Sequence, residues 1–142
     1  MNIIILEDND TKFSHIEKYL FKNRITNITR EKSYNGMLDN ITNAIKLGVP
    51  YDLAILDTII PKGDVSPDKN NILYNGGVRL FRKIRKLGIS IPVMFCTSED
   101  VRFGEDEESA PVIKYNQNSC FDKFFDRVIN SLKGEESDYG TK

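Results

Sequence analysis

Short apolar runs alternate along this chain with stretches of helical periodicity, and this alternation limits the possible folds more than any other feature. Five runs have the length and composition of strands, and they cover residues 2–6, 25–31, 53–56, 91–96 and 111–113. Most of them are continuous in apolar residues, as in strands buried on both faces of a parallel sheet. The second run is the weakest, because its only apolar residues are Ile25 and Ile28.

Four stretches between and after these runs carry apolar residues three and four positions apart, the spacing of a helix with one buried face. Asn9 or Asp10 can cap the first of these helices, and Ser33 can cap the second. The third helix ends at Gly88, and the last covers residues 121–132. Strands that alternate with helices in this way predict an α/β fold, a doubly wound five-stranded parallel sheet with helices on both faces.

The composition argues against several classes of protein. Lysine and arginine number 20 against 21 acidic residues, so the net charge is −1 and there is no basic excess for nucleic acid. No apolar run approaches the length of a membrane span, and the first residues lack the basic region of a signal peptide. We therefore expect a cytoplasmic protein with no nucleic-acid or membrane partner, in which Cys96 and Cys120 stay reduced. The single histidine, His15, is expected at the surface.

Polar side chains stand at the points where the strand runs end. They are Glu7 and Asp8 after the first run, Asp57 after the third, Thr97 after the fourth and Lys114 after the fifth. Ligand sites of open parallel sheets form beyond the carboxyl ends of the strands, so we expect these side chains to lie together. Three carboxylates this close repel one another unless a cation binds, and ligands that are all oxygen favour Mg²⁺. The metal, the lysine and the hydroxyl together suit a phosphoryl group.

Each of these residues also has a structural interpretation. Glu7 and Asp8 could cap the first helix and interact with its dipole. Asp57 could be a turn residue, Thr97 could cap a residual helix, and Lys114 could be a solvated surface lysine. The occurrence of all of them at matching strand ends favours the functional interpretation.

In combination these signals resemble the response-regulator receiver domain. The matching segments are residues 5–9, 53–61, 77–85, 91–98 and 111–114. The resemblance extends over residues 1–132 and includes a proline four residues after Asp57. It implies a flavodoxin-like fold with the strand order 2-1-3-4-5.

The resemblance implies a role for each strand-end carboxylate. Asp57 is implied to be the phosphoacceptor and a ligand of Mg²⁺. Asp8 is implied to bind the metal directly, and Glu7 to orient a metal-bound water. The backbone carbonyl of Ile59 is implied to be a further metal ligand.

Thr97 and Lys114 are implied to contact the phosphoryl group. The implied function is that of a phosphoacceptor receiver module in a two-component phosphorelay. Such a module is not an enzyme in the usual sense, although it assists its own phosphoryl transfer and hydrolysis. It takes the phosphoryl group from a histidine kinase or phosphotransfer protein and signals through contacts with an output protein that the sequence does not identify.

Two alternatives stay open. The first is a receiver-like docking module that is not phosphorylated in the cell. The second is a Mg²⁺-dependent phosphohydrolase with an aspartyl nucleophile. The second is disfavoured, because Ile59 occupies the position where such enzymes carry another aspartate.

The sequence departs from the family pattern in three places. An insertion at 62–75 stands where the family has a short turn. Residues 99–109 have little apolar periodicity, so the fourth helix is expected to be short or missing. Tyr115 follows Lys114 in place of the usual proline, and Pro111 stands where the family has its switch aromatic. We expect an intact chemical site beside a remodelled output surface.

The insertion also shapes the expected domain organisation. We expect one domain at residues 1–133, which includes the insertion, followed by a flexible tail at 134–142. Long loops in compact domains are usually functional. The insertion is therefore predicted to be a mobile lid over the pocket, hinged near Gly63 and residues 76–77, with a short structured turn near 72–74.

Overall fold

The computed structural model of the chain describes residues 1–63, 72–116, 126, 129 and 130. Most of the predicted last helix, Cys120 and the tail at 134–142 lie outside these residues. Within the described part, no helix combines the length and the apolar character that crossing a membrane requires.

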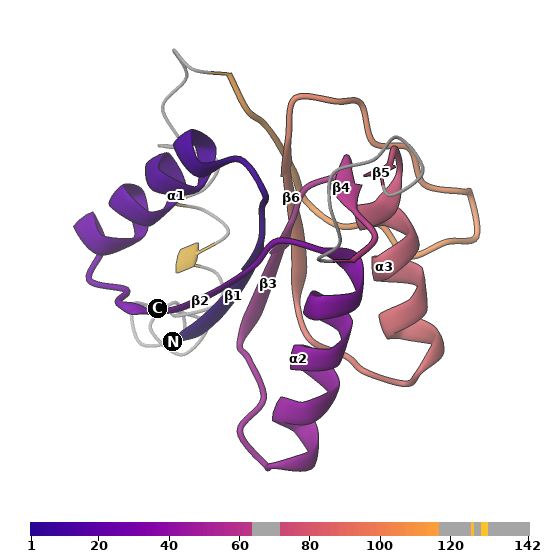
Figure 1. Cartoon of the computed structure of the whole chain (residues 1–142). Coiled ribbons are helices and arrows are strands. Elements are labelled where there is room, and N and C mark those ends of the chain that lie inside the picture. The colour runs from indigo at the N-terminus through magenta and orange to yellow at the C-terminus, as the bar shows by residue number, and fades with distance from the viewer. Residues whose placement is uncertain (64–71, 117–125, 127–128, 131–142) are drawn as a thin grey trace, which may run out of the picture.

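A sheet of five parallel strands forms the centre of the fold (Figure 1). The strands are β1 (Asn2–Leu6), β2 (Asn27–Glu31), β3 (Leu53–Leu56), β6 (Val93–Thr97) and β7 (Val112–Lys114). Their order across the sheet is β2-β1-β3-β6-β7. Counted along the chain through this sheet, that order is 2-1-3-4-5, so the predicted flavodoxin-like fold is confirmed.

The helices of the described part are α1 (Asp10–Lys22), α2 (Tyr34–Lys46) and α3 (Gly76–Lys86). Asn9 caps α1, because its side chain accepts a hydrogen bond of 2.9 Å from the backbone N–H of Lys12. Ser33 caps α2, as predicted, by accepting from the N–H of Gly36 at 3.1 Å. Helix α1 covers one face of the sheet, and α2 and α3 cover the other (Figure 1).

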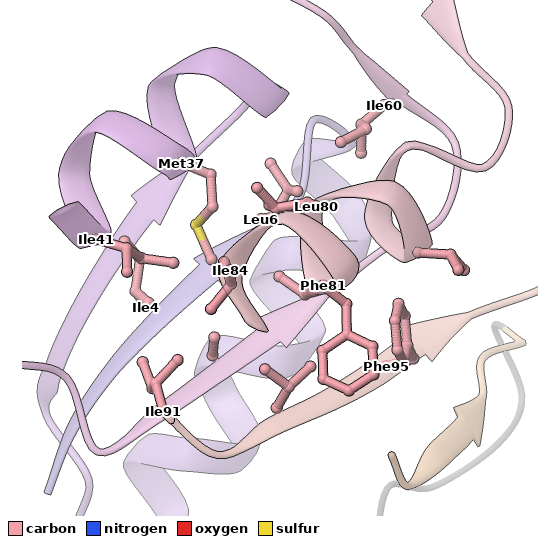
Figure 2. Close-up of a cluster of buried hydrophobic side chains, with 14 residues drawn as sticks. Ile4, Leu6, Met37, Ile41, Ile60, Leu80, Phe81, Ile84, Ile91 and Phe95 are labelled. Atoms are coloured by element: carbon pink, nitrogen blue, oxygen red, sulfur yellow. The ribbon is translucent and has the colours of Figure 1, made fainter. Parts of the chain in front are cut away.

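Side chains of β1 alternate between two hydrophobic clusters, one on each face of the sheet. The cluster under α2 and α3 includes Ile4, Leu6, Met37, Ile41, Leu80 and Phe81 (Figure 2). The cluster under α1 includes Ile3, Ile5, Ile16, Leu20, Met94 and Cys96. Ile129 is helical and buried in this second cluster, so this residue of the predicted last helix packs on the α1 side. Burial on both faces explains the continuous apolar runs of the strands.

Residues 98–111 connect β6 to β7 without a helix, in agreement with the short or missing fourth helix of the prediction. Aromatic side chains, and not the contacts of a helix, anchor this segment to the domain. The centre of the Phe103 ring lies 6.1 Å from the ring centre of Phe81 in α3 and 6.0 Å from that of Phe95 in β6. Ion pairs with α3 add to this packing, and they are Arg82–Glu107 at 2.8 Å and Arg85–Glu108 at 3.0 Å.

Two short strands bring the ends of the insertion together. Strand β4 (Ile60–Pro61) pairs antiparallel with β5 (Ile72–Leu73). The structured turn predicted near 72–74 is therefore in part a strand. Residues 64–71, which make up most of the predicted lid, lie outside the described residues.

The hinge predicted at residues 76–77 is wrong. Both glycines belong to the first turn of α3 and are buried. A Cβ atom on Gly76 would lie 2.6 Å from Cγ1 of Ile60, and one on Gly77 would overlap the carbonyl oxygen of Asp57. These glycines let the start of α3 approach β4 and the end of β3, a tertiary requirement that local sequence does not reveal.

Gly77→Ala is therefore expected to lower the free energy of unfolding by about 1–3 kcal/mol, the usual cost of an overpacked site. The added methyl group meets backbone and not a flexible side chain. Chemical denaturation followed by circular dichroism measures the change. Gly104→Ala is the control, because its Cβ would make only an ordinary contact of 3.6 Å. Equal unfolding midpoints for the two variants would contradict the packing argument.

Candidate functional site

Three carboxylates meet where β1 and β3 end. Glu7, Asp8 and Asp57 each offer an oxygen atom, and these atoms all lie within 4.8 Å of one another. They line an open pocket of about 480 Å³. The other lining residues are Asn9, Thr11, Lys12, Ile59, Ser98 and Tyr115. The structure thus brings the predicted metal ligands together, Ile59 included.

Lys12 is a residue of the candidate site that the sequence analysis missed. Its ammonium Nζ lies 2.8 Å from Oε1 of Glu7 and 3.3 Å from Oδ1 of Asp57. It also donates a hydrogen bond of 2.6 Å to the backbone carbonyl of Cys96. Only 8% of the side chain is exposed, so α1 delivers a buried cation to the carboxylate cluster.

The helical spacing contains the signal for this lysine. Positions 12, 16 and 20 lie four residues apart, and Lys12, Ile16 and Leu20 are the buried residues of α1. A lysine at a position of the apolar stripe is rarely buried without a partner. A lysine on this stripe that closely follows two acids at a strand end therefore indicates an ion pair with those acids.

Burial and mutual repulsion shift the ionisation of the cluster. Burial, with a smaller contribution from the charge of Asp57, raises the pKa of Glu7 to about 7 against the opposing effect of Lys12. Burial also raises the pKa of Asp8. Burial by itself would lower the pKa of Lys12, but the attraction of Asp57 and Glu7 outweighs it and raises that pKa. Lys12 therefore stays charged, and its single ammonium faces three carboxylates.

The donor set of the pocket fits a hard divalent cation. Three carboxylates, an amide and several hydroxyl side chains line the pocket, and no cysteine or histidine is among the described residues of the lining. Oxygen ligands of this kind suit Mg²⁺. Glu7 is only 2% exposed and already engaged by Lys12, whereas Asp8 is open to solvent. Asp8 and Asp57 are thus better placed than Glu7 to reach an ion directly.

Thr97 reaches Asp57 through a second threonine. Its hydroxyl is fully buried and lies 2.9 Å from the hydroxyl of Thr58. It also accepts a hydrogen bond of 3.1 Å from the backbone N–H of Glu99. The backbone N–H of Thr58 in turn donates to Oδ1 of Asp57 at 2.8 Å. Thr58, which the sequence analysis did not single out, therefore connects the end of β6 to the candidate phosphoacceptor.

Lys114 is the predicted site residue that the structure does not bring to the cluster. Its Nζ pairs with Oδ1 of Asp100 at 2.6 Å and donates to the carbonyl of Ser98 at 3.3 Å. Its side chain is 57% exposed. The ammonium beside Asp57 is that of Lys12.

Tyr115 lines the pocket next to Lys12, with the ring centre 5.3 Å from Nζ of the lysine. The hydroxyl of Tyr115 lies 2.7 Å from Nδ1 of His15. His15 is partly exposed, as expected of a surface histidine, and this contact connects it to Tyr115.

Removing the ammonium should destabilise the protein and increase its response to metal. In the absence of divalent cations, Lys12→Met is expected to lower the free energy of unfolding by about 3–5 kcal/mol, because buried carboxylates lose their partner. Mg²⁺ should then raise the melting temperature of the variant more than that of the wild type. Thermal unfolding with EDTA and with excess Mg²⁺ measures both effects.

Lys18→Met is the matched control, since Lys18 lies exposed on the same helix. Its stability should stay within about 0.5 kcal/mol of the wild type. Equal losses for the two variants would show that the ion pair of Lys12 contributes nothing.

No family model matches the chain, and no curated protein matches it either. Solved structures do. One is the N-terminal domain of a response regulator/sensory box/GGDEF three-domain protein from Carboxydothermus hydrogenoformans, at 19% identity and a TM-score of 0.64 over 98% of this chain and 99% of that one. A mutant of the receiver domain of the histidine kinase CKI1 from Arabidopsis thaliana matches at 15% identity and a TM-score of 0.55, over 96% and 89% of the two chains. The resemblance found in the sequence is thus confirmed for the fold, and the chain has the receiver-domain fold.

Proposed function

We propose that the chain is the receiver module of a two-component phosphorelay, phosphorylated on Asp57 with the help of Mg²⁺. The observation that carries the proposal is the position of Asp57. Its carboxylate lies at the carboxyl edge of a receiver-type sheet, with two further carboxylates and a buried ammonium around it. This edge is where ligands of open α/β sheets bind.

In the proposed transfer, a carboxylate oxygen of Asp57 forms a bond to the phosphorus atom of a phosphohistidine. The bond from phosphorus to the imidazole nitrogen breaks, its electron pair stays on the imidazole, and that ring takes a proton from water. Bound Mg²⁺ would offset the charge of the phosphoryl oxygens. Asp8, Asp57 and the carbonyl of Ile59 would hold the ion directly, and Glu7 through water.

The partners proposed on this basis are a histidine kinase or phosphotransfer protein as donor and an output protein as receiver of the signal. The module would not be an enzyme acting on an outside substrate. Its domain would cover residues 1–133. The cytoplasmic location and the absence of a nucleic-acid partner stay predictions.

A receiver-like docking module that is not phosphorylated is the second candidate. The observation that favours it is Lys12, whose ammonium already pairs with Glu7 and Asp57 and could substitute for a metal ion. In that case Lys12 and the acids of the pocket would form a permanent structural ion pair, and phosphodonors would leave the chain unmodified.

Incubation with acetyl phosphate and Mg²⁺ distinguishes the two candidates. We expect intact mass spectrometry to show one added phosphoryl group, with acetate as the leaving group, and no addition when EDTA is present. Asp57→Asn should abolish the addition, because the amide lacks the nucleophilic oxygen. Asp39→Asn is the control, an exposed aspartate of α2. Modification that persists in Asp57→Asn would refute the assignment, and an unmodified wild type would favour the docking module.

Asp8 should contribute more to metal affinity than Glu7. Asp8→Asn removes a charge that is open to the ion, whereas Glu7→Gln removes one that Lys12 already compensates. We expect Asp8→Asn to weaken Mg²⁺ binding by about tenfold or more, and Glu7→Gln to weaken it less. Isothermal titration calorimetry with Mg²⁺ measures the two affinities. A larger loss for Glu7→Gln would reverse the proposed order of ligands.

A further inference from the structure

We propose that Lys12 of α1, and not the strand-end Lys114, supplies the ammonium that neutralises and holds the phosphoryl group on Asp57. The inference rests on the proposed function, because it assigns the cation of that same site. Among the described residues that line the pocket, Lys12 is the only lysine or arginine.

The distances place one donor of Lys12 within reach of a group attached to Asp57. An ammonium has three N–H donors. The three acceptors are Oε1 of Glu7 at 2.8 Å, the carbonyl of Cys96 at 2.6 Å and Oδ1 of Asp57 at 3.3 Å. Asp57 is the most distant of the three. The N–H of Lys12 that faces Asp57 can therefore turn to a phosphoryl oxygen, while the contacts with Glu7 and Cys96 keep Nζ in place.

The charge balance favours the same exchange. A phosphoryl group carries about 1.5–2 negative charges and three acceptor oxygens, more than the carboxylate oxygen it would replace as the partner of Lys12. Charge-assisted hydrogen bonds from a buried ammonium to such oxygens are among the stronger polar contacts in proteins. Lys12 would thus gain a better acceptor on phosphorylation.

Lys12 is also held in position from the helix side. Its backbone N–H donates to Oδ1 of Asn9 at 2.9 Å in the cap of α1. Ile16 and Leu20 follow on the same stripe and are buried in the core cluster under α1. The lysine therefore stands at a fixed point above the carboxyl edge of the sheet.

Lys114 lacks this arrangement. Its ammonium pairs with Asp100, on the segment that connects β6 to β7, and its side chain is 57% exposed. Tyr115 lines the pocket beside Lys12, whereas Lys114 does not line it. To reach Asp57, Lys114 would have to leave its ion pair and would meet Lys12, a like charge already there.

Beryllofluoride is the probe for this inference, because it mimics a phosphoryl group on an aspartate without a chemical step. Its binding with Mg²⁺ is followed by ¹⁹F NMR for the wild type, Lys12→Met, Lys114→Met and the surface control Lys18→Met. We expect Lys12→Met to weaken beryllofluoride binding about tenfold or more, the loss of one hydrogen bond to a charged group. Lys114→Met should weaken it less than Lys12→Met, and Lys18→Met should match the wild type. In addition, Lys12→Arg should restore part of the affinity that Lys12→Met loses.

A measurement on the wild type covers the case in which Lys12→Met does not fold. The ¹H–¹⁵N signals of the lysine ammonium groups are followed at low temperature and mildly acidic pH, conditions that slow their exchange with water. The signal of Lys12 should shift when beryllofluoride binds, and that of Lys114 should not. A loss of affinity confined to Lys114→Met, or a shift confined to the Lys114 ammonium, would overturn the inference while the proposed function stands. A wild type that neither binds beryllofluoride nor accepts phosphate from acetyl phosphate would overturn both.

Discussion

The buried ion pair between Lys12 and the strand-end acids is the interaction on which the site depends. It connects α1 to the ends of β1 and β3 and to a carbonyl of β6. Without the ammonium, Glu7 would be an unpaired charge with 2% exposure, which proteins rarely tolerate. The same contact gives the pocket its electrostatic character, because one ammonium compensates only part of the negative charge of the carboxylate cluster.

The half of the pocket formed by β6 and β7 is the half that differs from the pattern the family resemblance implies. The segment between these strands has no helix, and Asp100 on this segment pairs with Lys114. Thr97 meanwhile turns to Thr58. Loss of the helix and outward placement of the strand-end lysine thus occur in one connected region. On the other half, the acids that follow β1 and β3 lie within 4.8 Å of one another.

The strands, the helix caps and the gathering of the acids could be predicted because each follows from a local pattern. Apolar runs mark buried strands, Ser33 marks a helix start, and parallel strands bring their carboxyl ends to one edge. The direction of Lys114 could not be predicted in the same way. A strand register places its backbone, but its long side chain follows partners such as Asp100 that only the folded chain supplies.

Lys12 and the glycines of α3 are further residues whose roles depend on contacts formed only in the folded chain. The lysine stands on an apolar stripe, and only a count of helical positions beside the neighbouring acids would have revealed its burial. Gly76 and Gly77 look like a flexible pair in the sequence. Their small size is instead required by Ile60 and by the backbone of Asp57, which come close only after folding.

The pairing of β4 with β5 has a consequence for how this chain can change over evolution. Because Pro61 pairs with Ile72, the ends of the inserted segment keep a fixed separation whatever number of residues lies between them. Each doubling of the length of a closed loop costs only about 0.6 kcal/mol. Insertions and deletions can therefore accumulate between these two strands while Asp57 and the start of α3 stay where they are. A lineage can in this way vary the inserted segment without altering the carboxylate cluster.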